Sequence, residues 1–390
     1  MENIFSRIVE RRNTSSYKWD FCKELTGYKN LLPMWLADMD FHSPPEIIEA
    51  IKKRADHGVF GYTVTPASYY EAFIQWVKAR YSWDIKREWI TVAPDVLRAI
   101  VFAIHAYTNL GDKVVIQPPV YYPFKKLILN NGRQVIENQL IFDGKQYFMD
   151  YEQLEELIDS RTKMLILCNP HNPIGRSWTL EELRKLSEIC SCHDILVVSD
   201  EIHSDLVFEG YQHIPFAKIS TQSGSMTITC NSPSKTFNLS GCCIANVIIE
   251  NEELLTSYHN ICESLWTKMT NIFSILAAET GYRNCESWLE EVLQYIYGNY
   301  LLLKNYLDAE IPSIEVVELQ ATYLAWIDFR NTGLKSEKIN RLLREEAEVW
   351  LDEGKIFGAG GELFQRMNIA CPRTALQESL SRIKRTFGKF

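Results

Sequence analysis

The sequence predicts an α/β protein: a large domain with a mostly parallel sheet flanked by helices, followed by a smaller α+β domain. Between about residues 89 and 250, short β-rich runs alternate with helical stretches, which is the pattern of an α/β fold. Several of these runs are apolar almost throughout, as strands buried on both faces of a parallel sheet should be. From about residue 310 onwards, strands and helices return in a different order, and the 390 residues leave room for two or three domains.

The strands of the large sheet are expected, in order, at Trp89 to Val92, Lys113 to Gln117, Lys163 to Cys168, Ile195 to Ser199, Met226 to Cys230 and Ile244 to Ile249. The helices between them also have signals of their own. Apolar residues from Val96 to Ile104 recur at helical spacing, and Thr179-Leu180-Glu181-Glu182 is a capping box that opens a helix. The crossovers between strands are therefore expected to be helical.

The rest of the chain is expected to be helical at about 252–280 and 285–308, with strands at Tyr323 to Phe329 and Phe364 to Ile369, a helix from Ser336 to Ala347, and a last helix from about Thr374. We predict an N-terminal segment, 1–48, that packs with the small domain, a large domain at 49–284 and a small domain at 285–390.

Composition excludes several classes of protein. The formal net charge of −9 argues against a general nucleic-acid binder. No apolar run approaches the roughly 18 residues of a membrane span, and the first residues are polar, so we expect a cytoplasmic protein that does not bind membranes. The ten cysteines are expected to be reduced. Their spacing does not match a zinc site, and no metal is expected.

A lysine follows one of the predicted strands. Lys235 lies in Ser232-Pro233-Ser234-Lys235-Thr236, at the carboxyl end of a strand, where open α/β sheets bind ligands. Such a lysine can be an ordinary solvated loop residue. It can also form a Schiff base with pyridoxal phosphate, whose phosphate Ser232 and Ser234 would then bind.

Two further polar segments end neighbouring strands. Asp200, in Ser199-Asp200-Glu201-Ile202-His203, could keep the ring nitrogen of pyridoxal phosphate protonated, or simply cap a turn. Asn172, in Asn169-Pro170-His171-Asn172-Pro173, could bind the ring hydroxyl, or belong only to a turn. Three such segments at the strand ends of one sheet favour a shared cofactor site over three unrelated turns.

These three segments resemble the motifs of the pyridoxal-phosphate-dependent aminotransferase superfamily with the aspartate-aminotransferase fold. Within it, four further segments resemble the cystathionine β-lyases of the MalY/PatB group. These segments are Lys18-Trp19-Asp20, Pro33 to Phe41, Val120 to Phe124 and Asn368 to Arg373. The likeness spans about residues 12–385.

The resemblance implies a role for each matched residue. Lys235 would hold the cofactor, Asp200 would pair with its pyridine nitrogen, Asn172 would bind its ring oxygen, Tyr121 would stack on its ring, and Arg373 would bind the α-carboxylate of the substrate. A guanidinium can hold a carboxylate with two parallel hydrogen bonds. The alternative for Arg373 is an ordinary surface arginine.

The phosphate of the cofactor would be bound by Ser232, Ser234 and the backbone N–H groups of Val96 and Leu97 at a helix N-terminus. Tyr62 matches a tyrosine that reaches the phosphate in the neighbouring subunit, which implies a homodimer; a core aromatic is the alternative.

Three positions bear on how far the resemblance holds. His203 stands where typical aminotransferases have a tyrosine that bonds the ring oxygen, which favours the lyase group. Asp95 replaces a usual glycine and would place a carboxylate near the phosphate, where repulsion would weaken cofactor binding. Cys243 occupies the place of an arginine that binds the phosphate in many aminotransferases.

The function implied is a carbon–sulfur β-lyase that cleaves cystathionine, cysteine or another S-substituted cysteine to a thiol, pyruvate and ammonia. Lys235 would remove the Cα proton, and Tyr121 or Lys235 would protonate the leaving group. An aminotransferase would share these residues. A regulator that binds the cofactor without depending on catalysis is the alternative from another class.

Overall fold

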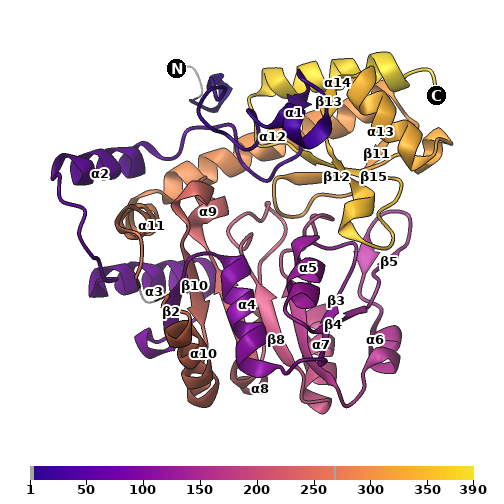
Figure 1. The fold of residues 1–390 in the computed structure, drawn as a ribbon. Coiled ribbons are helices and arrows are strands. Elements are labelled where there is room, and N and C mark those ends of the chain that lie inside the picture. The colour runs from indigo at the N-terminus through magenta and orange to yellow at the C-terminus, as the bar shows by residue number, and fades with distance from the viewer. Residues whose placement is uncertain (1–3, 268) are drawn as a thin grey trace.

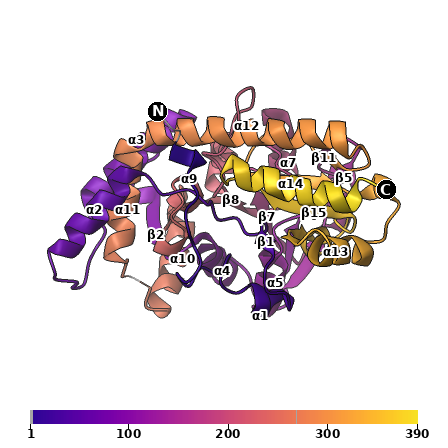
Figure 2. The ribbon, with the colours of Figure 1, turned by 90° about the horizontal axis from the view of Figure 1, so that it is seen from above.

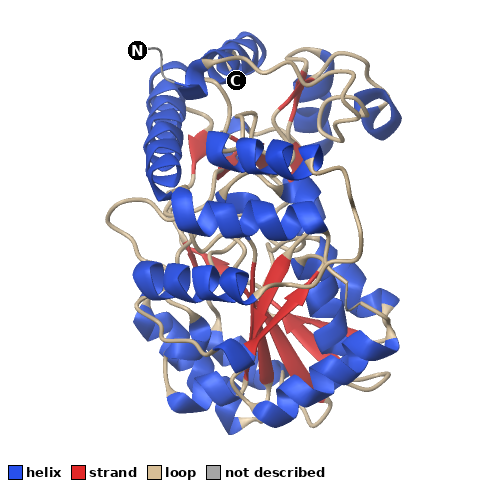
Figure 3. Ribbon diagram, turned by 90° about the vertical axis from the view of Figure 1, so that its left-hand side faces the viewer, coloured by secondary structure: helices blue, strands red, loops and turns tan. Residues whose placement is uncertain are grey.

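The computed structural model describes residues 4–267 and 269–390. A seven-stranded sheet with helices on both sides forms the lower part of the molecule, and a smaller sheet with its helices lies beyond one end of its strands (Figure 1). In Figure 3, the strands of the large sheet fan out between the helical layers. The predicted fold class, with a mostly parallel large sheet and a smaller antiparallel one, is confirmed.

The large sheet contains every strand that the sequence predicts for it. Its order is β2 (Ile90–Ala93), β10 (Ala245–Ile248), β9 (Thr227–Asn231), β8 (Leu196–Asp200), β7 (Thr162–Cys168), β3 (Lys113–Ile116) and β4 (Gln134–Glu137). Only β10 runs antiparallel to its two neighbours. The edge strand β4 was not predicted; its side chains are exposed or half-buried, so it lacks the apolar run that marks the other strands.

The central strands are buried on both faces, as their composition predicts. In β7, Met164 and Ile166 pack into one apolar cluster with helix α4, while Leu165 and Leu167 pack into another with helix α7. Alternate residues of a strand point to opposite faces, so a strand covered on both sides must be apolar throughout.

The covering helices begin where the sequence indicates. Thr179 and Glu182 form the predicted capping box at the start of α7. One face carries α4 (Val96–Tyr107), α5 (Pro123–Asn130) and α10 (Glu252–Ser264), and the other carries α6 (Tyr151–Leu157) and α7 (Leu180–Cys192). Beside them lie α2 (Pro45–Asp56), α3 (Ala67–Tyr81) and α11 (Ile272–Asn284), which pack against one another.

The prediction of one helical stretch over 252–280 is wrong, because the structure has two helices there, α10 and α11. Trp266, just after α10, has a left-handed φ of 52°. Asn271 then starts the second helix, since its side chain accepts hydrogen bonds from the N–H groups of Phe273 and Ser274. The long helix expected next is present as α12 (Glu286–Glu310).

The C-terminal part is built on an antiparallel sheet. Its order is β11 (Glu315–Val316), β12 (Leu324–Asp328), β15 (Phe364–Asn368) and β14 (Asp352–Glu353), accompanied by α13 (Ser336–Glu345) and α14 (Arg373–Phe387). Seen from above, α12 and α14 lie side by side over this sheet (Figure 2).

The N-terminal segment joins the C-terminal part. Its strand β1 (Leu32–Pro33) pairs in parallel with β13 (Val349–Trp350). A contact between the N-terminal segment and the C-terminal part agrees with the prediction that residues 1–48 pack with the small domain. The domain boundaries at 48 and 284 stay a prediction. Residues 1–3 lie outside the described residues. Within residues 4–267 and 269–390, no helix is both long and apolar enough to span a bilayer.

Candidate active site

One cavity gathers nine of the eleven predicted site residues. It lies at the carboxyl ends of β7, β8 and β9, next to the start of α4. Parallel neighbours end at the same edge of the sheet, so residues far apart in the chain meet there. The predicted residues that line it are Val96, Leu97, Tyr121, Asn172, Asp200, His203, Ser232, Ser234 and Lys235.

Lys235 is the only lysine among the residues that line this cavity in the described chain. It follows β9 in the single-turn helix α9 (Pro233–Thr236). Its Nζ donates hydrogen bonds to the carbonyl oxygen of Ala37, at 2.7 Å, and to Oγ of Ser240, at 3.1 Å. Burial lowers the pKa of Lys235 to about 8. A substantial fraction of its amine is therefore neutral near physiological pH, as a nucleophile or base requires.

Asp200 is the last residue of β8 and is buried. One carboxylate oxygen, Oδ1, accepts a hydrogen bond from the N–H of Ile202 at 3.1 Å. Burial raises the pKa of Asp200 to about 7, because the charged form has lost most of its hydration. A cationic group placed against this carboxylate would favour its ionised form again.

The opposite end of the cavity is suited to an anion. The first N–H groups of α4, at Val96 and Leu97, have no acceptor within the helix and carry the positive end of its dipole. The hydroxyls of Ser232 and Ser234 lie 3.0 Å apart in the same cavity. Backbone N–H groups and hydroxyls together form the kind of site that binds a phosphate.

Asp95 lies at this anion-binding end, as its sequence position suggests. It is the N-cap of α4: its carboxylate accepts from the N–H of Arg98 at 2.7 Å and forms an ion pair with the Arg98 guanidinium at 2.6 Å. The cap and the neighbouring cation therefore offset part of the negative charge that Asp95 brings to the cavity.

Asn172, Tyr121 and His203 surround the middle of the cavity. Burial lowers the pKa of His203 to about 3, so its ring is neutral at physiological pH. Burial also raises the pKa of Tyr121, which keeps its phenol protonated. These groups can orient a planar ring without adding charge to it.

Arg373 is not brought to this cavity. Its side chain is exposed at the start of α14, with the guanidinium 5.2 Å from the ring centre of Tyr295 and Nε 3.4 Å from Oδ1 of Asn299. The structure therefore favours the alternative that the sequence left open, in which Arg373 is an ordinary surface arginine.

A different arginine contacts a residue that lines the cavity, and the sequence reasoning missed it. Arg366, in the middle of β15, is 2% exposed, and its guanidinium donates to Oδ1 of Asn172 at 2.9 Å. It also donates to the carbonyl oxygen of Trp35 and forms an ion pair with Asp352. A charged residue in the middle of a predicted strand was the available signal, since every residue of Phe364–Asn368 is buried and a buried charge needs a partner or a function.

A second missed feature is the segment from Met34 to Phe41, which supplies Ala37 to the wall of the cavity. The sequence reasoning used this segment only as part of the resemblance. Its contact with Lys235 could not be read from the chain, because the two lie far apart in sequence.

Tyr62 lies outside the cavity of its own chain. Its side chain is 95% exposed, in the connection between α2 and α3, and Val59, Phe60 and Val64 beside it are exposed too. It is therefore not a core aromatic. Its predicted contact with a neighbouring subunit stays a prediction.

The residues present fit pyridoxal phosphate. They offer an amine for its aldehyde, a carboxylate for its ring nitrogen, a neutral polar and aromatic surround for its ring, and hydroxyls with a helix N-terminus for its phosphate. Within the described residues, no group of three or more histidine, cysteine or acidic side chains could hold a metal ion.

A sheet of this topology with a lysine and an acid on neighbouring strand ends defines an enzyme class that binds a phosphorylated cofactor through a lysine. The family model for aminotransferase class I and II matches residues 34–383, and the chain belongs to this family.

Three relatives place the chain more narrowly. It is 40% identical to cystathionine beta-lyase PatB of Bacillus subtilis over 97% of this chain and 98% of that one. It is 30% identical to protein MalY of Escherichia coli, over 97% of each chain. The crystal structure of cystalysin from Treponema denticola, which contains pyridoxal 5'-phosphate, superposes with a TM-score of 0.95 at 36% identity, covering 99% of both chains. Within the family, the chain thus belongs to the MalY/PatB-like group.

Proposed function

We propose that this protein is a pyridoxal-phosphate-dependent carbon–sulfur β-lyase. It cleaves cystathionine, cysteine or another S-substituted cysteine to a thiol, pyruvate and ammonia. The observation that carries the proposal is the cavity that joins Lys235, whose pKa is lowered to about 8, with the buried carboxylate of Asp200. The full-length likeness to PatB, whose name is cystathionine beta-lyase, supports the choice of reaction.

The residues of the cavity have separate roles in this reaction. Bound pyridoxal phosphate supplies an electron sink for the charge that is left when a proton leaves the substrate Cα. Lys235 accepts that proton, because its amine is partly neutral near pH 7. Asp200 stabilises positive charge at the ring nitrogen, and Asn172 fixes the orientation of the ring.

We assign recognition of the substrate α-carboxylate to Arg366 in place of Arg373. Arg366 lies against Asn172, which lines the cavity, whereas Arg373 is exposed elsewhere. Arg366 is also held by the carbonyl oxygen of Trp35 and by Asp352, so little side-chain entropy remains to be lost when it binds. Its Nε is buried and still has a free donor in the described chain.

Protonation of the departing thiolate fits Tyr121 or Lys235. Tyr121 keeps its proton at neutral pH because burial raises its pKa, and Lys235 holds a proton once it has taken one from the substrate. A Tyr121→Phe variant separates the two. If Tyr121 is the acid, this variant loses most activity with substrates whose thiolate leaves poorly and little with substrates whose thiolate leaves well.

The test of the proposal is thiol and pyruvate release from L-cystathionine and from L-cysteine by the purified protein with pyridoxal phosphate. Lys235→Ala is run in parallel, with Lys304→Ala, an exposed lysine on α12, as the matched control. We expect both products from the wild type and the control, and neither from Lys235→Ala. Amino transfer that depends on a keto acid, with no thiol released, would overturn the lyase in favour of the aminotransferase.

We further propose a homodimer in which Tyr62 reaches the cofactor phosphate of the partner. The exposed apolar side chains around Tyr62 support a contact with a second copy. Mixing inactive Tyr62→Ala with inactive Lys235→Ala should restore activity to about a quarter of wild type, since a mixed dimer has one intact site. Failure of the mixture to recover would contradict a shared site.

A further inference from the structure

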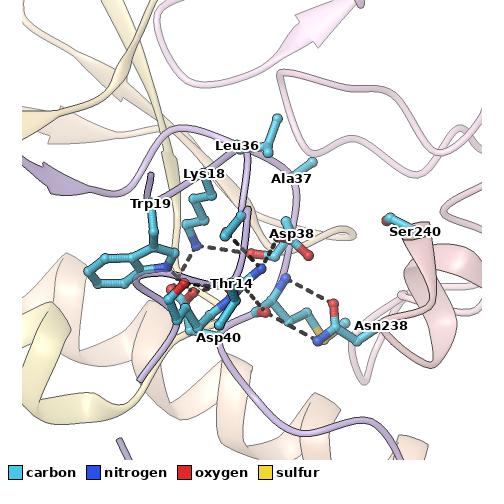
Figure 4. A network of polar contacts seen from close by, with 12 residues as sticks. Thr14, Lys18, Trp19, Leu36, Ala37, Asp38, Asp40, Asn238 and Ser240 are labelled. Carbon is cyan, nitrogen blue, oxygen red and sulfur yellow. Dashed lines mark hydrogen bonds and ion pairs between the residues drawn. The ribbon is translucent and has the colours of Figure 1, made fainter. Parts of the chain in front are cut away.

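A cluster of charged side chains surrounds Asp40, near the segment that carries Ala37 (Figure 4). Lys18 is 0% exposed, and its Nζ donates to Oδ2 of Asp40 at 2.7 Å and to the carbonyl oxygen of Asp38 at 2.9 Å. The indole N–H of Trp19 donates to Oδ1 of Asp40 at 2.9 Å. A fully buried lysine is rare in proteins, so this one requires an explanation.

Arg11 completes the cluster. Its Nη1 donates to Oδ1 of Asp40 at 2.9 Å and to the carbonyl oxygen of Met39 at 3.1 Å. Its Nη2 is 2.5 Å from Oδ2 of Asp38. Two cations therefore face two carboxylates, and both cations also bind main-chain oxygens of the segment that carries those carboxylates.

Two asparagines also hold the same segment. The Asn238 side chain donates to the carbonyl oxygens of Met39, at 3.1 Å, and Phe41, at 2.8 Å, and accepts from the N–H of Met39 at 3.2 Å. Asn368 donates to the carbonyl oxygens of Leu36, at 2.6 Å, and Asp38, at 2.8 Å. Side chains from three distant parts of the chain thus fix the backbone on both sides of Ala37.

The backbone that these side chains fix forms a hydrogen bond with Lys235. The carbonyl oxygen of Ala37 accepts a hydrogen bond from Nζ of Lys235 at 2.7 Å, and Oγ of Ser240 accepts a second at 3.1 Å. A neutral amine has two N–H donors and one lone pair. When both donors are held by fixed acceptors, the lone pair is left with a single direction.

Stability alone does not explain the buried cluster. Desolvation of two buried ions commonly outweighs their attraction, and apolar residues of similar volume stabilise a fold equally well. The charged and amide side chains of this cluster instead fix the position of the main chain of residues 36–41. The charge of Asp38 also opposes the effect of burial on the pKa of Lys235, so its position affects the amine as well.

We propose that Lys18 and Asp40 are positioning residues, which fix the Ala37 carbonyl and thereby direct the lone pair of Lys235. This inference rests on the proposed function, in which Lys235 accepts the Cα proton. Neither residue touches the cavity. Their effect passes through the backbone of Asp38 and Ala37.

The first test is Lys18→Met, which removes the charge and keeps the length of the side chain. Lys304→Met is the matched control, because Lys304 forms an exposed ion pair with Asp308 at 2.9 Å. We expect kcat for β-elimination to fall about 10- to 100-fold, as for a catalytic group misplaced by about 1 Å, with KM nearly unchanged. The control should keep wild-type values.

A second readout needs neither cofactor nor turnover. Apo protein is treated with an amine-reactive reagent at graded pH, and modification of Lys235 is followed by peptide mass spectrometry. In the wild type, the labelling midpoint should lie near the pKa of about 8. In Lys18→Met it should move towards the ordinary lysine value, since a released segment exposes the amine to water.

Some outcomes overturn the inference. A folded Lys18→Met protein with wild-type kcat and a wild-type labelling midpoint would show that the cluster is only structural. If Lys18→Met does not fold, the double variant Lys18→Met/Asp40→Asn, which leaves no unpaired buried charge, is measured in its place, with the same expected changes. An inactive wild type whose labelling midpoint still depends on Lys18 would overturn the lyase and leave the positioning intact.

Discussion

The cavity around Lys235 has two walls that are held in place differently. The inner wall lies at strand ends: hydrogen bonds between β8 and β9 fix Asp200, which closes β8, and anchor the start of the segment that carries Lys235. The outer wall is the segment around Ala37, held by side chains with charged or amide groups, and Arg366 of β15 contacts both this segment and Asn172. In the proposed mechanism, the inner wall supplies the reacting groups, and the outer wall determines the directions in which they point.

The two walls should therefore respond differently to substitution. Loss of a group from the inner wall removes a chemical function, so kcat should fall steeply. Loss of a group from the outer wall should alter substrate binding or the geometry of Lys235, with smaller effects. The experiments below test this distinction in order of decreasing effect.

Asp200→Asn should give the largest effect. The amide keeps the shape of the side chain but cannot stabilise a positive charge at the ring nitrogen, so kcat should fall about 100- to 1000-fold. Steady-state thiol release measures this. Asp159→Asn, a substitution of an exposed aspartate that pairs with Lys113, is the control and should leave kcat unchanged. Equal rates for Asp200→Asn and wild type would remove Asp200 from the mechanism.

The next effect separates two arginines. Arg366→Lys should raise KM for the amino acid about 10- to 100-fold, because an ammonium group cannot reproduce the two parallel hydrogen bonds of a guanidinium. Arg373→Lys should change KM by no more than about 2-fold. Thermal melting curves show whether either protein is misfolded. The reverse order of effects would return carboxylate binding to Arg373.

The pH dependence of the free energy of unfolding of the apo protein should report the shifted pKa values of Asp200 and Lys235, the two charged groups of the inner wall. The folded pKa of Asp200, about 7, lies above its unfolded value of about 3.9, so the folded state binds more protons between these pH values. This contribution to the free energy of unfolding is present below about pH 4 and is lost as the pH rises to about 7. The folded pKa of Lys235, about 8, lies below its unfolded value of about 10.4, so its contribution increases from about pH 8 to 10.

Urea unfolding of the apo protein at pH 4 to 10 measures both contributions. Asp200→Asn should flatten the low-pH part of the profile, and Lys235→Met should flatten the high-pH part. Profiles that both variants leave unchanged would contradict the shifted pKa values of these two groups.

The smallest effect is expected at the phosphate end. Asp95→Asn keeps a good N-cap for α4 and removes one negative charge beside the anion-binding N–H groups. The dissociation constant of pyridoxal phosphate should fall about 2- to 5-fold, since the charge is partly exposed and already paired with Arg98. Arg98→Gln should weaken binding by a similar factor. Weaker binding by Asp95→Asn would show that the carboxylate helps to hold the cofactor.

The sequence predicted the inner wall well because its signals are local. Asp200 ends one buried strand, and Asn172 and Lys235 each lie four residues beyond the end of another, so their placement at one edge of a parallel sheet needs only the strand assignments. The outer wall depends on long-range pairing that no local pattern encodes. Arg366 and Arg373 are seven residues apart, and the position of β15 decides that Arg366 is the one that contacts Asn172 in the cavity wall.

The same distinction explains the errors in secondary structure. The edge strand β4 lacks the apolar run of a buried strand, and its pairing with β3 is what makes it a strand. The break between α10 and α11 follows from a cap at Asn271, a signal that was present but lay inside a stretch of otherwise helical composition.

The pairing of the N-terminal segment with the C-terminal part also sets an order of events during synthesis. The carbonyl oxygen of Trp35 meets Arg366, which follows it in the chain by 331 residues. At about 5 to 20 residues per second, a ribosome needs roughly 17 to 66 seconds to synthesise that interval. During that time, the large sheet can form and bring Asp200 close to Lys235, while residues 34–41 still lack their contacts with the C-terminal part. The nascent chain thus completes this cavity only after β15 has been made, and residues 34–41 reach their native place later than the large sheet that follows them in the chain.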